Sequence, residues 1–246
     1  MTLDTQRIRA VVFDYGNTLI PFGRGEIAQL DAALHAGLAE HFTPPDPRMV
    51  AAIRDRNRMT PYQGDPPAYR ENDLTEITER LIRELYDIEP APEVVAELID
   101  VRHRAFVNVL QTPDYVVPLL ERLAGRYKLA VLSNYPGGAS IREGLARGGL
   151  DAYLEAVVVS GDLGYCKPHP ITFNTVANTI GLTPEALLYV GDNWLADVQG
   201  AKRAGWQMVL SQQWRPPEVF PPEPGHLEPD ATIGHLTELE TLLRDA

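Results

Sequence analysis

Cysteine is nearly absent from this sequence, and Cys166 is the only one among the 246 residues. A lone thiol cannot close an intrachain disulfide, and it cannot build a zinc site of closely spaced cysteine and histidine ligands. Long hydrophobic runs are also missing at the start of the chain, where the first apolar stretch is too short for a signal or membrane helix. We therefore expect a protein of a reducing compartment, the cytoplasm.

Positive charge is scarce as well. The chain has 22 Lys and Arg residues against 34 Asp and Glu residues, a formal net charge of -12. Proteins that bind nucleic acid or an anionic membrane need a basic surface, so we expect neither kind of partner. A phosphorylated substrate would need a metal ion or a well-placed lysine or arginine to offset this negative field.

Short apolar runs alternate with helical patterns over most of the chain. A first strand is expected at residues 8–14, with later strands at 128–132, 156–160, 187–190 and 207–210. Helices are expected between them, at 116–124, 139–147, 170–180 and 196–204, and an edge strand at 231–233 and a helix at 235–243 close the chain. This alternation predicts an α/β fold, a doubly wound parallel sheet with helices on both faces.

Residues 26–111 interrupt this alternation with helical patterns alone. Apolar residues recur there at helical spacing, as in Leu30, Leu34 and Leu38. Proline-rich segments at 44–47, 64–67 and 89–92 divide the region into about four helices. We therefore predict an α/β core of residues 1–20 and 111–246 and an inserted helical domain of residues 21–110.

Polar side chains follow several of the predicted strands. Asp14 ends the first strand, Ser133 and Asn134 end the next, and Asp192 ends the strand of residues 187–190. Each alone has an ordinary structural explanation as a turn former or helix cap. The carboxyl ends of parallel strands meet at one edge of the sheet, however, and ligands bind there, so we expect a common site.

Four motifs in order along the chain make the sequence similar to the haloacid dehalogenase superfamily of hydrolases, most of which are phosphatases. They are Asp14-x-Gly16-x-Thr18, Val131-Leu132-Ser133-Asn134, Lys167-Pro168-x-Pro170-x-x-Phe173 and Gly191-Asp192-Asn193-x-x-x-Asp197. The resemblance spans nearly the whole α/β core. It implies that the inserted helical domain is the helical cap of this superfamily.

The resemblance implies a role for each motif residue. Asp14 would be the nucleophile that forms an aspartyl-phosphate. Asp14, the backbone carbonyl of Gly16, Asp192 and Asp197 would hold Mg²⁺, with Asp197 either a ligand or a support for the site. The Ser133 hydroxyl, the amide of Asn134 and the Lys167 ammonium would bind the phosphoryl oxygens of a small phosphorylated metabolite, and Lys167 would also keep Asp14 ionised.

Gly16 departs from the superfamily pattern, because phosphatases of this kind usually carry a second aspartate there as general acid and base. One interpretation is a phosphatase in which the leaving group or another side chain compensates; the candidates are His169, Arg54, Arg56, Arg58, Tyr62, His103 and Arg104. The alternatives are a 2-haloacid dehalogenase, which needs neither that acid nor a metal, and a weak or inactive protein that binds a phosphorylated ligand.

Asp192 and Asp197 favour the phosphatase over the dehalogenase. Extra carboxylates around Asp14 would repel a carboxylate substrate, whereas they suit a magnesium site. Dehalogenases also usually carry an aromatic residue two places after the nucleophile, and here that residue is Gly16. No motif in the helical region identifies the substrate or the oligomeric state.

Overall fold

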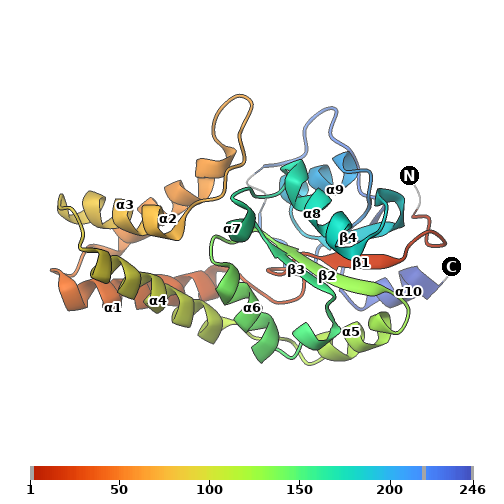
Figure 1. The fold of residues 1–246 in the computed structure, drawn as a ribbon, viewed down its shortest axis with the longest axis horizontal. Coiled ribbons are helices and arrows are strands. Elements are labelled where there is room, and N and C mark those ends of the chain that lie inside the picture. The colour runs from red at the N-terminus through yellow and green to blue at the C-terminus, as the bar shows by residue number, and fades with distance from the viewer. Residues whose placement is uncertain (1–2, 218–219, 245–246) are drawn as a thin grey trace.

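A six-stranded parallel sheet forms the centre of the molecule in the computed structural model, which describes residues 3–217 and 220–244 (Figure 1). The strand order is β3-β2-β1-β4-β5-β6, and every neighbouring pair is parallel. The strands are β1 (Ala10–Phe13), β2 (Lys128–Ser133), β3 (Ala156–Val159), β4 (Leu187–Gly191), β5 (Gln207–Ser211) and β6 (Ala231–Ile233). The predicted doubly wound α/β fold is confirmed.

Alternate residues of each strand supply two apolar layers, one on each face of the sheet. In β1, Val11 and Phe13 join the layer packed by α5 (Val116–Ala124), α6 (Gly138–Arg147) and α10 (Glu238–Arg244). Ala10 and Val12 join the opposite layer, packed by α8 (Pro170–Ile180) and α9 (Gly200–Arg203). All four residues of β1 are buried. Because β1 is the third of the six strands, its carboxyl end lies near the middle of the sheet edge.

Four helices make up a separate lobe beside the sheet (Figure 1). They are α1 (Arg24–His41), α2 (Pro47–Met59), α3 (Leu74–Tyr86) and α4 (Pro92–Val109), with a short 3-10 turn at Thr60–Tyr62. Asp46 and Asp73 cap α2 and α3, and the lobe has its own apolar cluster around Leu38, Leu81 and Leu98. All four helices fall between residues 21 and 110, and the exact division from the core stays a prediction.

Three local details differ from the sequence-based expectation. Ser160, predicted to end a strand, begins the short helix α7 (Ser160–Leu163). The helix predicted at 196–204 is a π-helix over Trp194–Gln199 followed by α9, with the Val198 N–H donating to the Asn193 carbonyl at 3.1 Å. The last helix begins at Glu238. Among the described residues, no helix is long and apolar enough to cross a membrane.

Candidate active site

Asp14 lies directly after β1, at the carboxyl edge of the sheet. Its N–H donates to the Val190 carbonyl at 2.9 Å, which continues the pairing of β1 with β4. The chain then turns sharply: Asn17 has a left-handed φ of 59°, and its side-chain oxygen accepts from the Phe22 N–H at 3.0 Å. Asparagine tolerates this conformation better than most residues, so the turn fixes the direction in which the Asp14 carboxylate leaves the sheet.

The Lys167 ammonium lies beside Asp14 in the interior. It donates to Asp14 Oδ1 at 2.7 Å, to Asp197 Oδ1 at 2.8 Å and to the Tyr189 hydroxyl at 2.7 Å. An ammonium group has three N–H donors, so protein acceptors occupy all three. Burial alone would lower the pKa of Lys167, but the charges of Asp14 and Asp197 raise it well above the usual range.

Three carboxylates gather at this point. Asp14, Asp192 and Asp197 each offer one oxygen, and these oxygens lie within 4.8 Å of one another. Asp197 is the most engaged of the three, because its Oδ1 accepts from Lys167 and its Oδ2 accepts from the Asn193 N–H at 2.8 Å. Gly191 allows this approach, since a Cβ at that position would lie 2.4 Å from Asp197 Oδ2.

Burial makes the negative charge of the cluster costly. It raises the pKa of Asp14 to about 6, although the Lys167 charge acts in the opposite direction. The pKa of Asp192 is raised well above its usual value, first by burial and then by the charges of Asp14 and Asp197. The three carboxylates share the Lys167 ammonium, with Arg215 donating to the Asp192 carbonyl at 3.0 Å. Hard oxygen ligands of this kind fit Mg²⁺.

Ser133 is the last residue of β2, and Asn134 follows it. Ser133 is 4% exposed. The Asn134 side chain holds the backbone of Lys167 on both sides: its Oδ1 accepts from the Lys167 N–H at 2.8 Å, and its Nδ2 donates to the Lys167 carbonyl at 3.1 Å. The Asn134 side chain therefore fixes the loop that carries Lys167. The sequence alone did not predict this role for Asn134.

Position 16 faces an apolar side chain. A Cβ on Gly16 would lie 3.5 Å from Phe22 Cβ, an ordinary van der Waals contact. The Phe22 ring packs on Phe106 of α4 with a centroid distance of 5.4 Å. The Cβ of a side chain at position 16 would therefore be accommodated, with Phe22 as its neighbour.

The seven side chains considered as substitutes for that acid are mostly engaged elsewhere. Arg54, Arg56 and Arg104 form ion pairs with carboxylates of the helical lobe. His103 binds Ser140 and Glu143 of α6, His169 caps α8, and Arg58 is exposed.

Tyr62 is the member of this set that contacts the site residues. Asn134 Nδ2 donates to its hydroxyl at 3.3 Å, and the hydroxyl donates to the Lys167 carbonyl at 3.5 Å. Burial raises the pKa of Tyr62 well above its usual value. Its hydroxyl is therefore neutral, and it links the helical lobe to the loop of Lys167.

A second link from the helical lobe lies just before Lys167. The Cys166 N–H donates to the Tyr69 carbonyl at 2.9 Å, and the Glu71 N–H donates to the Gly164 carbonyl at 3.1 Å. The Glu71 carboxylate also accepts from the Ser160 hydroxyl. Burial raises the pKa of Glu71 despite this bond and the nearby charge of Arg102.

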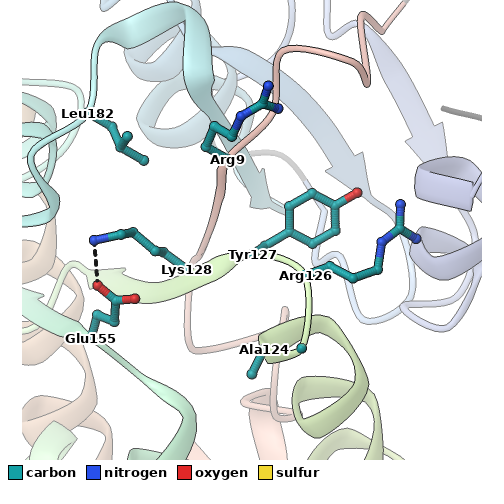
Figure 2. A pocket seen from close by; sticks show the side chains of 8 residues that line it. Arg9, Ala124, Arg126, Tyr127, Lys128, Glu155 and Leu182 are labelled. Carbon is teal, nitrogen blue, oxygen red and sulfur yellow. Dashed lines mark ion pairs between the residues drawn. The ribbon is translucent and has the colours of Figure 1, made fainter.

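The opposite edge of the sheet holds a shallow hollow of about 420 Å³ (Figure 2). Its cations already have partners: Lys128 pairs with Glu155 at 2.9 Å, and Arg126 donates to the Leu243 carbonyl at the end of α10. Arg9 donates to the Gln6 and Ile8 carbonyls. The cations of this hollow are therefore engaged with a carboxylate and with backbone carbonyls. The polar residues predicted from the sequence lie at the carboxyl edge instead.

Comparison with known proteins places this geometry in a family. A family model described as haloacid dehalogenase-like hydrolase matches residues 8–205, and the chain belongs to this family of hydrolases. A glyceraldehyde 3-phosphate phosphatase of Methanopyrus kandleri is 28% identical over 97% of this chain and 98% of its own length. A phosphoglycolate phosphatase of Salmonella typhi is 28% identical over 83% of this chain and 81% of its own.

Solved structures of the family share the fold. A 2-haloacid dehalogenase from Pseudomonas syringae superposes with a TM-score of 0.73 at 25% identity, covering 97% of this chain and 99% of that one. Dehalogenases and phosphatases thus both lie among the similar proteins. The roles of the individual site residues must therefore be argued from the geometry of this chain.

Proposed function

We propose that this protein hydrolyses a small phosphate monoester with the help of Mg²⁺, through an aspartyl-phosphate on Asp14. The observation that carries the proposal is the buried cluster in which Asp14, Asp192 and Asp197 converge beside Lys167. A dehalogenase has no use for the two additional carboxylates, which would repel its carboxylate substrate. We expect the protein to act on this small phosphorylated metabolite in the cytoplasm, a reducing compartment that suits a chain with a single buried thiol.

Asp14 is the nucleophile of this proposal. Its Oδ1 is held by Lys167, which leaves Oδ2 to attack the phosphorus atom in line with the leaving oxygen. Lys167 keeps the carboxylate ionised and oriented, and the Ser133 hydroxyl and the backbone amide of Asn134 bind phosphoryl oxygens. Water then opens the aspartyl-phosphate and regenerates Asp14.

The metal ligands would be Asp14, the Gly16 carbonyl and Asp192. Mg²⁺, when bound, supplies the positive charge that lets a carboxylate approach a phosphate dianion. Asp197 acts as a support in this proposal, because Lys167 and the Asn193 N–H already occupy both of its oxygens.

The missing side chain at Gly16 affects which leaving groups the substrate can carry. Without an acid there, a leaving group that departs as a stable anion is hydrolysed faster than an alkoxide. We therefore expect aryl, acyl or enol phosphates to be better substrates than simple alkyl phosphates.

The direct test is hydrolysis of p-nitrophenyl phosphate and a panel of phosphorylated metabolites by the full chain, with Mg²⁺ and with a chelator. We expect metal-dependent phosphate release that is lost in Asp14→Asn. Chelator-insensitive chloride release from 2-chloropropionate would instead establish a dehalogenase. Tight binding of a phosphorylated metabolite without turnover of any substrate would establish a binding protein.

A further inference from the structure

Tyr189 lies in β4, and its hydroxyl group contacts the Lys167 ammonium of the site. The residue is completely buried, and its ring packs edge-on against Phe173 with a centroid distance of 5.6 Å. Trp206 contacts the same ring at 6.2 Å. These neighbours fix the ring, so the hydroxyl has a defined position at the carboxyl edge.

The Tyr189 hydroxyl bonds two partners, one as donor and one as acceptor. Its single proton goes to the Leu132 carbonyl at 3.0 Å. Its lone pairs therefore face the Lys167 ammonium, which donates to it at 2.7 Å. The hydroxyl is a neutral acceptor, and burial raises its pKa well above the usual value.

Resting on the function proposed above, we propose that Tyr189 is a positioning residue for Lys167. The lysine has a flexible four-carbon stem, and three acceptors in different directions determine where its ammonium stands. Two of them, Asp14 and Asp197, are charged and would draw the ammonium between them. Tyr189 supplies the third direction and holds it against Asp14 Oδ1, so that Oδ2 remains aligned for attack.

Removing this hydroxyl leaves one Lys167 N–H without an acceptor among the aromatic rings. The ammonium then has to turn, and its alignment with Asp14 is lost. Tyr189 itself touches neither phosphoryl oxygens nor the leaving group in this arrangement. The effect should therefore fall on the chemical step more than on substrate binding.

The test compares Tyr189→Phe with Tyr15→Phe in the full chain, with p-nitrophenyl phosphate and Mg²⁺. Tyr15 is the matched control, because its buried hydroxyl has no hydrogen-bond partner among the described residues. We expect kcat of Tyr189→Phe to fall about 10- to 100-fold, the range for a hydrogen bond to a charged group, with KM within about twofold. Inhibition by vanadate, which imitates the transition state, should weaken in proportion, and Tyr15→Phe should match the wild type.

An unchanged kcat in Tyr189→Phe, or a rise in KM alone, would overturn the proposal. Circular dichroism establishes that the variants are folded, and Tyr189→Met, which also lacks the hydroxyl, repeats the comparison if Tyr189→Phe is not. The ¹⁵N signal of the Lys167 ammonium gives a readout that does not need turnover. This ammonium signal should be observed in the wild type and in Tyr15→Phe, where the protons are protected from exchange with water, and it should be lost in Tyr189→Phe. Equal signals in all three proteins would refute the positioning role, even if the wild type proves not to be a phosphatase.

Discussion

Gly16→Asp is the substitution that tests the chemistry most directly. The Cβ at position 16 meets Phe22 Cβ at 3.5 Å and Phe22 Cγ at 4.0 Å, both ordinary contacts. The backbone of Gly16 is outside the left-handed region, so a side chain introduces no strain there. The variant should fold with the new carboxyl group at the carboxyl edge, beside the Asp14 turn.

The expected gain follows from what an acid at this position would do. The new group would lie next to Phe22 and near three carboxylates, and both burial and like charge raise the pKa of a carboxyl group. In its protonated form it could donate a proton to a departing alkoxide. General acid catalysis is typically worth about 10²- to 10⁴-fold, or about 2.7 to 5.4 kcal/mol in the barrier.

The assay compares kcat/KM for an alkyl phosphate with that for p-nitrophenyl phosphate. We expect a large gain for the alkyl phosphate and a small one for the aryl phosphate, whose leaving group needs no proton. Gly16→Asn is the control, since it has the same shape without an acidic proton. Mg²⁺ binding measured by calorimetry establishes that the metal site is intact. An unchanged or lower rate on the alkyl phosphate, in a folded variant that binds Mg²⁺, would mean that another group already protonates the leaving oxygen or that chemistry is not limiting.

Three further predictions concern the charges of the site. The pKa of Asp14 is raised from 3.8 to about 6 by folding. Between pH 3.8 and about pH 6, the folded state therefore keeps a proton that the unfolded state has released. The contribution of this carboxyl group to the free energy of unfolding should fall as the pH rises through that window. Thermal unfolding of metal-free protein across this window should show that fall in the wild type and a smaller one in Asp14→Asn. Lys167→Met leaves the carboxylates of Asp14 and Asp197 without their buried partner. We expect the free energy of unfolding by urea at neutral pH to fall by about 3 to 5 kcal/mol, and added Mg²⁺ should partly restore it. Equal stability with and without Lys167 would contradict the charge argument. Glu71→Leu removes the carboxylate acceptor of the buried Ser160 hydroxyl and leaves it only the Tyr135 carbonyl at 3.4 Å. We expect a loss of about 0.5 to 1.5 kcal/mol by the same urea method, with Glu71→Gln losing less; identical losses would mean that the hydrogen bond to Glu71 is unimportant.

The sheet and the residues at its edge were accessible to sequence reasoning because both follow simple periodicities. Apolar runs predict buried strands, and the residue after such a run lies at the carboxyl edge, as Asp14 does. Tyr189 was not accessible in this way. It lies in the apolar strand Leu187–Gly191, where a tyrosine has the pattern of a core residue, and only the packing of its ring shows where the hydroxyl points.

Contacts between the helical lobe and the core could not be predicted for a different reason. Glu71 and Tyr62 lie in a segment with no periodicity, and their partners Ser160 and Asn134 follow much later in the chain. Such contacts depend on how two packed units meet, which no local pattern encodes. The π-helix at Trp194–Gln199 is similar, because its wider turn depends on the bonds that Asn193 and Asp197 make with each other and the backbone.

The ammonium of Lys167 connects these observations in one argument about the site. With all three N–H groups given to Asp14, Asp197 and Tyr189, it can bind a phosphoryl oxygen only by releasing a protein acceptor. Its main contribution is therefore to orient and ionise Asp14, and the charge of the phosphoryl group must be met by other groups. Ser133 and backbone amides are neutral, and Arg215 donates to the Asp192 carbonyl at 3.0 Å, so in the proposed mechanism Arg215 and a metal ion held by Asp14 and Asp192 are the candidates for meeting that charge. If Mg²⁺ proved unnecessary for phosphate release, the phosphoryl charge would have to be met by Arg215 or by a Lys167 that has released one of its protein acceptors.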